Sequence, residues 1–303
     1  MEFLLFADDT NLLYANKNLE SLETVINDEL LKVVDWLTAN KLSLYIKKAN
    51  YIIFHPYQKR LNYDVNIKIL DRHVNKYFNL ERKEYVKYLG VMIDNHLSWK
   101  HHINYVALTI SRNIGILSKL RHFVPPKTLY NSLIFPYLSY GLVAWGQAAK
   151  THLDKLLILK KRAVHLINFA PFRSHAVPYF LHSNIMPITL LYFNLSSVLM
   201  FDVYDNTAPH NILHLFIPTQ QIHSYSTRSS SSGNYYISHS RLNQKNDSFF
   251  IMGAKIWNST PENLRNSSKF LFKEKVHTIL LKIFDVQDRY ADLHTIISDF
   301  KKY

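Results

Sequence analysis

The first forty residues combine two short apolar runs with one long helical repeat. The runs Phe3–Phe6 and Thr10–Tyr14 flank a polar tip and predict a β-hairpin. From residue 19 to residue 37 apolar side chains recur at helical spacing. Asn18 is placed to cap the first turn of this helix and Asn40 to end it. The pattern therefore predicts a hairpin followed by an amphipathic helix.

Further strands are predicted up to residue 93. Leu42, Leu44 and Ile46 alternate with polar residues, which predicts a half-buried strand, and residues 48–50 turn into a second strand at 51–54. Residues 65–69 alternate again. Residues 85–93 predict a strand or a hairpin in which Gly90 allows a bulge or a close backbone approach. A hairpin, a packed helix and more strands together indicate an α+β unit.

From Trp99 onward the periodicity becomes helical. We expect an α+β chain in three parts: residues 1–97 as the mixed unit, 98–215 as a helical region, and 216–303 as a linker with a C-terminal helical segment. The expected features, in chain order, are a helix after a Ser98 cap, one opened by Pro125-Pro126 and kinked at Pro136, one over 153–167, one from Pro187 to about Tyr204, a flexible Ser-rich stretch at 224–233, and helices at 249–257 and 270–283.

Charge points to a polyanionic partner. Lys and Arg number 36 against 23 Asp and Glu, a net charge of +13, and this balance favours nucleic acid over an anionic membrane. A basic protein without such a partner is the alternative. The chain has no cysteine, which excludes disulfides and Cys-bound zinc and fits a reducing compartment without requiring one.

Neither a signal peptide nor a membrane span is predicted. The most apolar stretch, residues 188–201, is too short and is interrupted by Thr189, Asn194, Ser196 and Ser197. Lys and Arg are spread over several elements rather than gathered on one amphipathic helix, so a peripheral membrane protein fits poorly. We expect a soluble protein, with cytoplasm and nucleus left open.

Asp8 and Asp9 are the first candidate for chemistry. Adjacent carboxylates at a hairpin tip suit Mg²⁺, which takes one or two protein carboxylates and leaves positions for water and phosphates. Polymerases use two such ions for nucleotidyl transfer. The alternative is an ordinary solvated turn, since Asp tolerates turn backbone angles.

Two basic segments are candidates for phosphate contacts, and one histidine pair is a weak candidate for a metal. The helix expected at 153–167 and the turn at Pro125-Pro126 could track a nucleic-acid backbone, or could simply be solvated. His210 and His214 have i, i+4 spacing but lack a zincin Glu or a cysteine partner, which disfavours zinc. The basic residues are Lys119, Arg121, Lys127, Lys155, Lys160, Lys161 and Arg162.

The order and spacing of several segments resemble the C-terminal half of the reverse transcriptase of LINE-type non-LTR retrotransposons, close to the jockey-like elements. The resemblance covers almost the whole chain and includes the family's catalytic motif C and motif D. Its segments are Leu4–Thr10 (motif C), Asn40–Phe54 (motif D), Tyr88–Val91 with Asp94, Leu97, Trp99 and His102-Ile103, Leu129-Tyr130 through Pro136–Leu138 to Tyr140-Gly141 and Trp145-Gly146, and Gly253 with Trp257-Asn258 and Pro261.

The resemblance implies roles for single residues. Asp8 and Asp9 would be the motif C pair that binds Mg²⁺, with Asp8 the more direct ligand. Lys48 would be the motif D lysine that protonates pyrophosphate, although a solvated turn explains it equally well. Tyr88, Leu89 and Gly90 would form the primer grip, a role compatible with a buried strand and a bulge. Tyr45 and Ala49 depart from the pattern expected near motif D.

On this resemblance, residues 1–97 would be part of a polymerase palm, 98–215 a thumb-like region and 216–303 the C-terminal segment. The parent enzyme would use an RNA template, a DNA primer and deoxynucleoside triphosphates. The family's first catalytic aspartate lies upstream of motif C and does not occur in this chain. We therefore expect the chain alone to be inactive, since its two-metal site is incomplete. The alternative is a noncatalytic transposon remnant that binds nucleic acid.

Overall fold

The computed structural model describes residues 1–7, 9–72, 74–171, 173–222, 233–287 and 290–303. The chain divides into two compact units, Met1–Leu97 and Ser98–Tyr303, each considered by itself. The expected Ser-rich loop falls largely on residues 223–232, outside the described residues. The combination of small hairpins and many helices confirms the expected α+β class.

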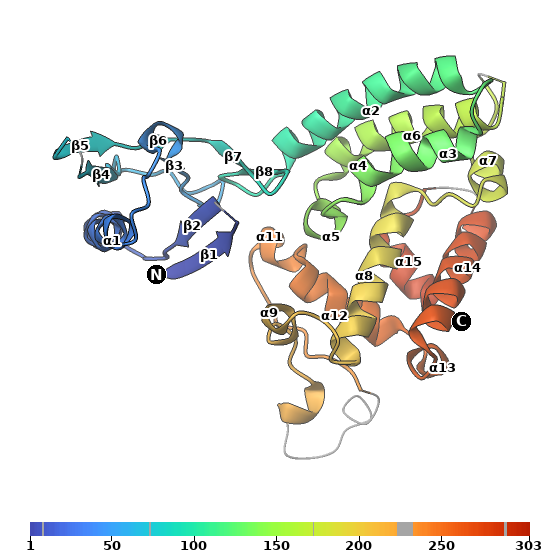
Figure 1. Cartoon of the computed structure of the whole chain (residues 1–303). Coiled ribbons are helices and arrows are strands. Elements are labelled where there is room, and N and C mark those ends of the chain that lie inside the picture. The colour runs from blue at the N-terminus through green and yellow to red at the C-terminus, as the bar shows by residue number, and fades with distance from the viewer. Residues whose placement is uncertain (8, 73, 172, 223–232, 288–289) are drawn as a thin grey trace. The chain divides into compact units, whose positions relative to one another are not determined.

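In its described residues, the first unit has one long helix and four small two-stranded sheets (Figure 1). Three of the sheets are antiparallel hairpins, and the fourth pairs two-residue strands in parallel. The elements are β1 (Glu2–Phe6) with β2 (Asp9–Leu13), α1 (Leu19–Ala39), η1 (Ile46–Lys48), β3 (Asn50–Tyr51) with β6 (Glu81–Arg82), β4 (Lys68–Asp71) with β5 (Lys76–Asn79), and β7 (Tyr85–Tyr88) with β8 (Val91–Asp94).

Helix α1 begins and ends as its sequence predicts. The Asn18 side chain accepts hydrogen bonds from the backbone N–H groups of Glu20 and Ser21, at 2.8 and 3.4 Å, and Asn40 is the C-cap. An N-cap of this kind stabilises a helix by about 1 kcal/mol relative to alanine. The apolar face of α1 packs on the alternating residues 65–69, which form the core with it; the buried residues are Leu30, Val34, Val65, Ile67 and Ile69.

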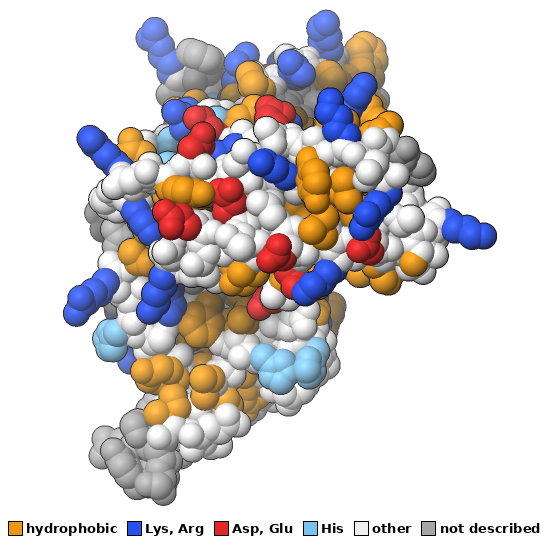
Figure 2. Space-filling model, turned by 90° about the vertical axis from the view of Figure 1, so that its left-hand side faces the viewer, with side chains coloured by type: hydrophobic (Ala, Val, Ile, Leu, Met, Phe, Trp, Pro, Cys, Tyr) orange, Lys and Arg blue, Asp and Glu red, His pale blue; other side chains and the backbone are white. Residues whose placement is uncertain are grey.

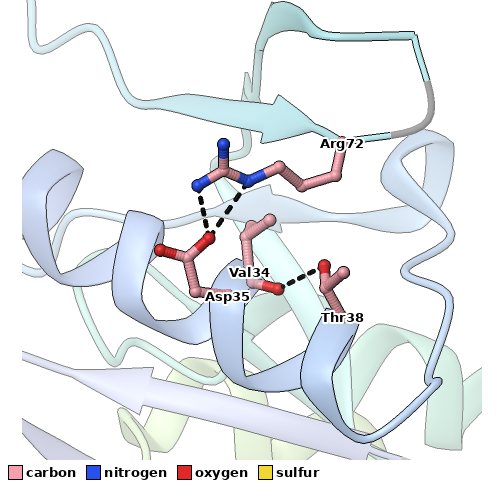
Figure 3. Close-up of polar contacts among 4 residues, drawn as sticks. All are labelled: Val34, Asp35, Thr38 and Arg72. Atoms are coloured by element: carbon pink, nitrogen blue, oxygen red, sulfur yellow. Dashed lines mark hydrogen bonds and ion pairs between the residues drawn. The ribbon is translucent and has the colours of Figure 1, made fainter.

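Polar contacts tie α1 to the loop after β4. The Arg72 guanidinium forms an ion pair with Asp35, and its Nε donates to Asp35 Oδ1 at 3.0 Å (Figure 3). One turn further on, Thr38 Oγ1 donates to the Val34 carbonyl at 2.8 Å. Because the Arg72–Asp35 pair is exposed, it contributes at most about 1 kcal/mol, and burial of the apolar face dominates this packing.

The strand predicted over residues 42–47 is wrong. Lys41 has a positive φ of 56° and turns the chain, Leu42 and Leu44 are exposed, and Ile46–Lys48 form a 3₁₀ turn instead. The predicted strand at 51–54 shortens to β3. Alternation alone did not ensure a strand here, because neither apolar leucine reaches a surface on which to be buried.

The second unit is helical (Figure 1). Its predicted helices are confirmed, and shorter ones join them. The elements are α2 (Lys100–Leu120), α3 (Pro126–Leu133), α4 (Phe135–Ser139), α5 (Leu142–Trp145), α6 (Lys150–Ile167), α7 (Val177–His182), α8 (Ile188–Tyr204), α9 (His210–Leu213), η2 (Thr219–Gln221), α11 (Asn243–Asn246), α12 (Phe249–Ser259), α13 (Glu262–Arg265), α14 (Lys269–Gln287) and α15 (Leu293–Phe300).

Two local expectations change at helix ends. Trp99, with a φ of 62°, precedes α2 as its N-cap residue, and Ser98 Oγ accepts a long 3.4 Å bond from the Lys100 N–H. Where Pro136 was expected to kink one helix, the chain instead breaks at Ile134 into α3 and α4. Asn113 of α2 donates to the Leu133 carbonyl at 2.7 Å and satisfies the carbonyl end that this break exposes.

Helix α8 is the centre of the second unit. It packs against α12, α14 and α15, and apolar side chains on every side of it are buried. A helix that is hydrophobic all round is expected in such a position. The apolar run at 188–201 is therefore a core helix. In the described part of the chain every helix is too short or too polar to cross a membrane.

Gly115 and Gly146 predict opposite responses to the same substitution. A Cβ at Gly115, on the exposed side of α2, meets no atom within 4 Å, whereas one at Gly146 would lie 2.3 Å from Tyr192 Cδ2 and 2.7 Å from the Leu142 carbonyl oxygen. We expect G115A to stabilise the protein by about 0.5–1 kcal/mol through helix propensity. Urea unfolding checks this, with G146A as the matched, destabilised control; a G115A protein less stable than wild type would contradict it.

Candidate nucleic-acid interface and acidic hairpin

The acidic hairpin forms with the register that its sequence suggests. Strands β1 and β2 pair antiparallel with Phe6 opposite Asp9, and Ala7, the residue that follows β1, has a positive φ of 51°. Asp9 is exposed at the first position of β2. Asp8 lies outside the described residues, so the geometry of the predicted pair is described only at Asp9.

Strand β1 carries large apolar side chains that are exposed to solvent. All five of its residues are exposed, including Phe3, Leu5 and Phe6. Within the described sheets β1 pairs with β2 alone, which leaves its outer edge open. Natural proteins seldom leave a hydrophobic strand edge open without a partner. Among the described residues, the β1–β2 hairpin therefore presents exposed apolar side chains next to an open strand edge.

A metal site is not complete among the described residues. No group of three His, Cys, Asp or Glu side chains that could hold an ion occurs in them. A two-metal centre requires carboxylates that converge from more than one element. Asp9 by itself therefore does not make up a complete Mg²⁺ site.

Lys48 lies at the end of η1 and is exposed. Its ammonium sits 5.4 Å from the centre of the Tyr45 ring, a cation–π contact. Within the described ranges, no hydrogen bond or ion pair joins Lys48 to Asp9. The structure thus gives Lys48 a local partner, and its role in proton transfer stays a prediction.

Tyr88, Leu89 and Gly90 lie at the tip of the β7–β8 hairpin. Tyr88 pairs with Val91 across a two-residue turn in which Leu89 and Gly90 both have positive φ, 44° and 85°. Two positive φ values are what a type I′ turn requires, and glycine adopts them without strain whereas leucine does not. The expected strand-or-hairpin is confirmed as a hairpin, with Gly90 in the turn rather than in a bulge. The primer-grip role of Tyr88, Leu89 and Gly90 stays a prediction.

The basic residues of α6 occupy three different environments. Lys155 donates to Asn104 Oδ1 at 3.0 Å, Lys161 Nζ lies 3.9 Å from the Tyr290 ring centre, and Arg162 is exposed. Lys160 differs from all of these, since it is only 1% exposed, and burial lowers its pKa to about 7. The expectation that Lys160 contacts phosphate is therefore corrected: it lies on the buried stripe of α6 with Leu156 and Val164.

Arg121 and Lys119 lie at the C-terminal end of α2. The Arg121 guanidinium stacks on Phe169, with Cζ 4.9 Å from the ring centre, and Nη1 donates to the Leu166 carbonyl at 3.3 Å. That carbonyl belongs to the end of α6, where a cation is favourable. Lys119 is exposed. Arg121 is thus a packed residue with one stacked face, and Lys119 is open to a ligand.

The two units carry very different net charges, a difference that the sequence motifs do not reveal. Residues 1–97 contain 13 Lys and Arg and 13 Asp and Glu, so the whole net charge of +13 belongs to residues 98–303. Between Asp94 and Asp202 there are eleven Lys and Arg and a single acid, Asp154. Figure 2 shows one face of the molecule, on which Asp and Glu lie among Lys and Arg. The excess of positive charge therefore lies mainly on α2–α8.

Among the described residues, the His210–His214 pair does not extend to a metal site. His210 and His214 approach each other, with Nε2 atoms 2.8 Å apart, and form an edge-to-face pair on the short helix α9. No third ligand joins them among the described residues. His102 is buried against Trp145, and burial lowers its pKa to about 4, so it remains neutral at physiological pH.

Comparison with known proteins finds several relatives, three of which match about half of the chain. The RNA-directed DNA polymerase from the mobile element jockey of Drosophila melanogaster is 25% identical over 177 residues, 55% of this chain. Probable RNA-directed DNA polymerases of the same species match as well, that of transposon BS at 25% over 181 residues and that of transposon X-element at 21% over 168. The chain is similar to jockey-type polymerases. The resemblance expected from the motifs is thereby confirmed.

The match to jockey-type polymerases covers only part of this chain and a smaller part of each relative. The aligned region makes up 18% of each of these three relatives. No protein-family model matches the chain, and no solved structure matches it. The polymerase palm therefore has no structural comparison, and the activity of the whole relatives reaches this chain only as a proposal.

Several residues of the jockey-like segments have structural roles in the second unit. Tyr130, Leu138 and Trp145 are fully buried, and the Trp145 indole N–H donates to the Tyr140 carbonyl at 3.0 Å. Gly141, with a φ of 62°, starts α5. These residues therefore build the core that positions the basic helices α2 and α6, rather than touching a ligand.

The C-terminal jockey-like segment is likewise a packing motif. Trp257 is fully buried, and Asn258 forms two hydrogen bonds with the backbone of Tyr235, at 2.9 Å to its N–H and 2.8 Å to its carbonyl. Arg265 stacks on the Trp257 ring, with Cζ 5.2 Å from its centre, and donates to carbonyls at the end of α12. This network joins α12 and α13 to the backbone at residues 233–235.

Proposed function

We propose that this chain is part of a retrotransposon RNA-directed DNA polymerase. In this proposal residues 1–97 contribute the motif C hairpin and the primer-grip turn to a palm, residues 98–215 contribute a thumb-like nucleic-acid interface, and residues 216–303 form the C-terminal segment. The observation that carries it is the similarity to jockey-type polymerases over 55% of the chain. The confinement of the net positive charge to residues 98–303 supports it independently.

The proposed substrates follow from the relatives. The template would be RNA, the primer DNA and the donors deoxynucleoside triphosphates. Asp8 and Asp9 would supply part of the Mg²⁺ coordination at the primer end, because carboxylate oxygens are preferred Mg²⁺ ligands. When bound, the metal ions would lower the barrier to attack by the primer hydroxyl. Lys48 would act as the proton donor to pyrophosphate.

Binding of an RNA–DNA hybrid by the whole chain tests the nucleic-acid part. We expect the affinity to fall steeply with salt, with a log–log slope of about −0.9 for each phosphate contacted. Asp9→Asn should change the affinity less than about twofold, because Lys and Arg on α2 and α6 make the contacts. Fluorescence anisotropy over a series of KCl concentrations measures both. A wild-type chain that does not bind the hybrid would refute this part.

Primer extension tests the catalytic part. We expect the chain alone not to extend a DNA primer on an RNA template with Mg²⁺, since a two-metal centre needs carboxylates from more than one strand. Loss of one member of a catalytic group commonly costs several orders of magnitude in rate. Extension that disappears in Asp9→Asn would show that the site is complete and that our expectation of inactivity is wrong.

Genomic sequence upstream of the Met1 codon provides a further test. An in-frame segment that encodes the motif A aspartate would supply the additional carboxylate. Unrelated sequence or stop codons there would favour a noncatalytic remnant.

A further inference from the structure

The C-terminal ends of α2 and α6 carry two exposed phenylalanines within the most basic part of the chain. Phe123, just after α2, is 84% exposed, and Phe169, just after α6, is 52% exposed. Contacts of Arg121 with Leu166 and Phe169 bring these two helix ends together. Figure 1 shows α2 and α6 lying side by side. We call Arg121, His122, Phe123 and Phe169 the aromatic platform.

The guanidinium of Arg121 and the imidazole ring of His122 already hold one side of this platform in place. Arg121 stacks on Phe169, and the His122 ring centre lies 5.2 Å from that of Phe169, inclined at 54°. Arg121 Nε also approaches His122 Nε2 at 3.3 Å. A ring that is fixed before a ligand arrives loses less conformational entropy when the ligand binds. Arg121 is a positioning residue here, because its donors already serve the end of α6.

Exposed cations flank the platform without an acid among them. Lys119 precedes it on α2, and Lys127 follows Pro125-Pro126 in the first turn of α3; both are exposed. Residues 95–153 contain no Asp or Glu. A single exposed phenylalanine is ordinary on a protein surface. Two exposed aromatic rings and two exposed lysines in a segment without Asp or Glu form a surface that suits stacked bases and phosphates.

We propose that the aromatic platform binds single-stranded nucleic acid. Unpaired bases stack on Phe123 and Phe169, and Lys119 and Lys127 contact the adjoining phosphates. Aromatic stacking with basic flanks is the general mode of sequence-tolerant single-strand binding. A duplex does not satisfy it, because paired bases stack on one another and hide their faces. The inference rests on the nucleic-acid part of the proposed function and adds a site and a preferred strand state.

Oligonucleotide binding by the whole chain tests this proposal. Anisotropy with a fluorescein-labelled 12-mer RNA, alone or annealed to its DNA complement, compares wild type with Phe123→Ala. We expect the variant to bind the single strand about tenfold more weakly, within the range of one lost stacking contact, and the duplex nearly unchanged. Phe123→Trp should restore single-strand binding, since it keeps a stacking ring. High exposure of Phe123 makes a folding defect in either variant easy to exclude by circular dichroism.

Two further variants separate stacking from charge. Phe270→Ala is the matched control, because Phe270 is 80% exposed at the start of α14, a helix that contributes no residue to the platform. It should change the single-strand affinity less than twofold. Lys119→Gln with Lys127→Gln should reduce the salt slope by about 1.4, or 0.7 for each phosphate contact on a single strand. Phe123→Ala should leave the slope unchanged.

Each remaining outcome decides between the proposals. A wild-type chain that binds neither single strands nor duplex refutes the nucleic-acid part of the proposed function. Wild-type binding that Phe123→Ala does not weaken refutes only the platform. Anionic phosphatidylserine vesicles serve as the competing partner: if Phe123→Ala abolishes vesicle binding and spares oligonucleotide binding, the surface is directed to membranes and the platform proposal is overturned.

Discussion

Replacement of Lys160 by methionine should stabilise the second unit by several kcal/mol at pH 6. Lys160 is buried on the core stripe of α6, and desolvation of its ammonium lowers its pKa to about 7 from the usual 10.5. Each pKa unit corresponds to about 1.4 kcal/mol of free energy. Methionine has a similar shape and no charge to desolvate, so the penalty disappears.

The sign of the pH dependence follows from the lowered pKa. Between pH 7 and 10.5 the unfolded chain holds the Lys160 proton and the folded chain does not, so the free energy of unfolding rises with pH across this window. The cost of burying the Lys160 ammonium is absent above pH 10.5 and is fully present below pH 7. Above pH 10 the buried Tyr130 and Tyr192, whose pKa values are raised by burial, act in the opposite direction.

Urea unfolding at pH 6, 7.5 and 9 measures the effect. We expect the wild type to gain stability from pH 7.5 to 9 and Lys160→Met to show a flatter profile over the same steps. Lys155→Met is the matched control, since Lys155 is exposed on the same helix. A Lys160→Met protein less stable than wild type at pH 6 would mean that the ammonium has a stabilising role.

Replacement of Arg265 by methionine should destabilise the second unit by about 3–5 kcal/mol, because it removes three hydrogen bonds from a charged donor, each worth about 1–3 kcal/mol. Its guanidinium donates to three acceptors: Thr260 carbonyl at 2.8 Å, Trp257 carbonyl at 2.7 Å and Asn234 Oδ1 at 3.0 Å. Two of these are carbonyls at the end of α12, which would lose a charged donor. Unsatisfied buried acceptors account for much of the expected loss.

Tryptophan fluorescence during urea unfolding reports this change directly, because Arg265 stacks on Trp257. Arg265→Lys should recover only part of the stability, since a lysine ammonium cannot match the planar fork of donors. Arg112→Met, at an exposed position of α2, should change the stability by less than about 0.5 kcal/mol. A loss below 1 kcal/mol in Arg265→Met would contradict the importance of the network.

Helical periodicity was the most dependable signal in the sequence. Helices α1, α2, α6, α8, α12 and α14 were expected from apolar spacing and are present, with Asn18 as the N-cap of α1. The strand expected at 42–47 failed because a strand depends on neighbours, and neither Leu42 nor Leu44 finds one. Short strands such as β3 and β6 have no pattern long enough to recognise.

The candidate site was predictable in part. The hairpin at the acidic pair followed from local patterns, because a turn is encoded by its own few residues. The turn at Leu89-Gly90 did not, since the pattern of residues 85–93 left a strand and a hairpin open and placed Gly90 in a bulge or a close backbone approach. The aromatic platform was not foreseen, since Phe169 is far in sequence from residues 121–123 and reaches Arg121 and His122 through the side-by-side packing of α2 and α6. The absence of acids between Asp94 and Asp154 would have pointed to this region.

The sequence by itself determined the helices, the hairpin at the acidic pair, the positive charge of residues 98–303 and the similarity to jockey-type polymerases. Only the tertiary structure decided which charges are available to a ligand. Lys160 and Arg162 lie two residues apart on one helix, yet one is buried and the other exposed, because their directions differ by about 200° around the helix axis. Burial depends on what packs against each face, and composition carries no record of that.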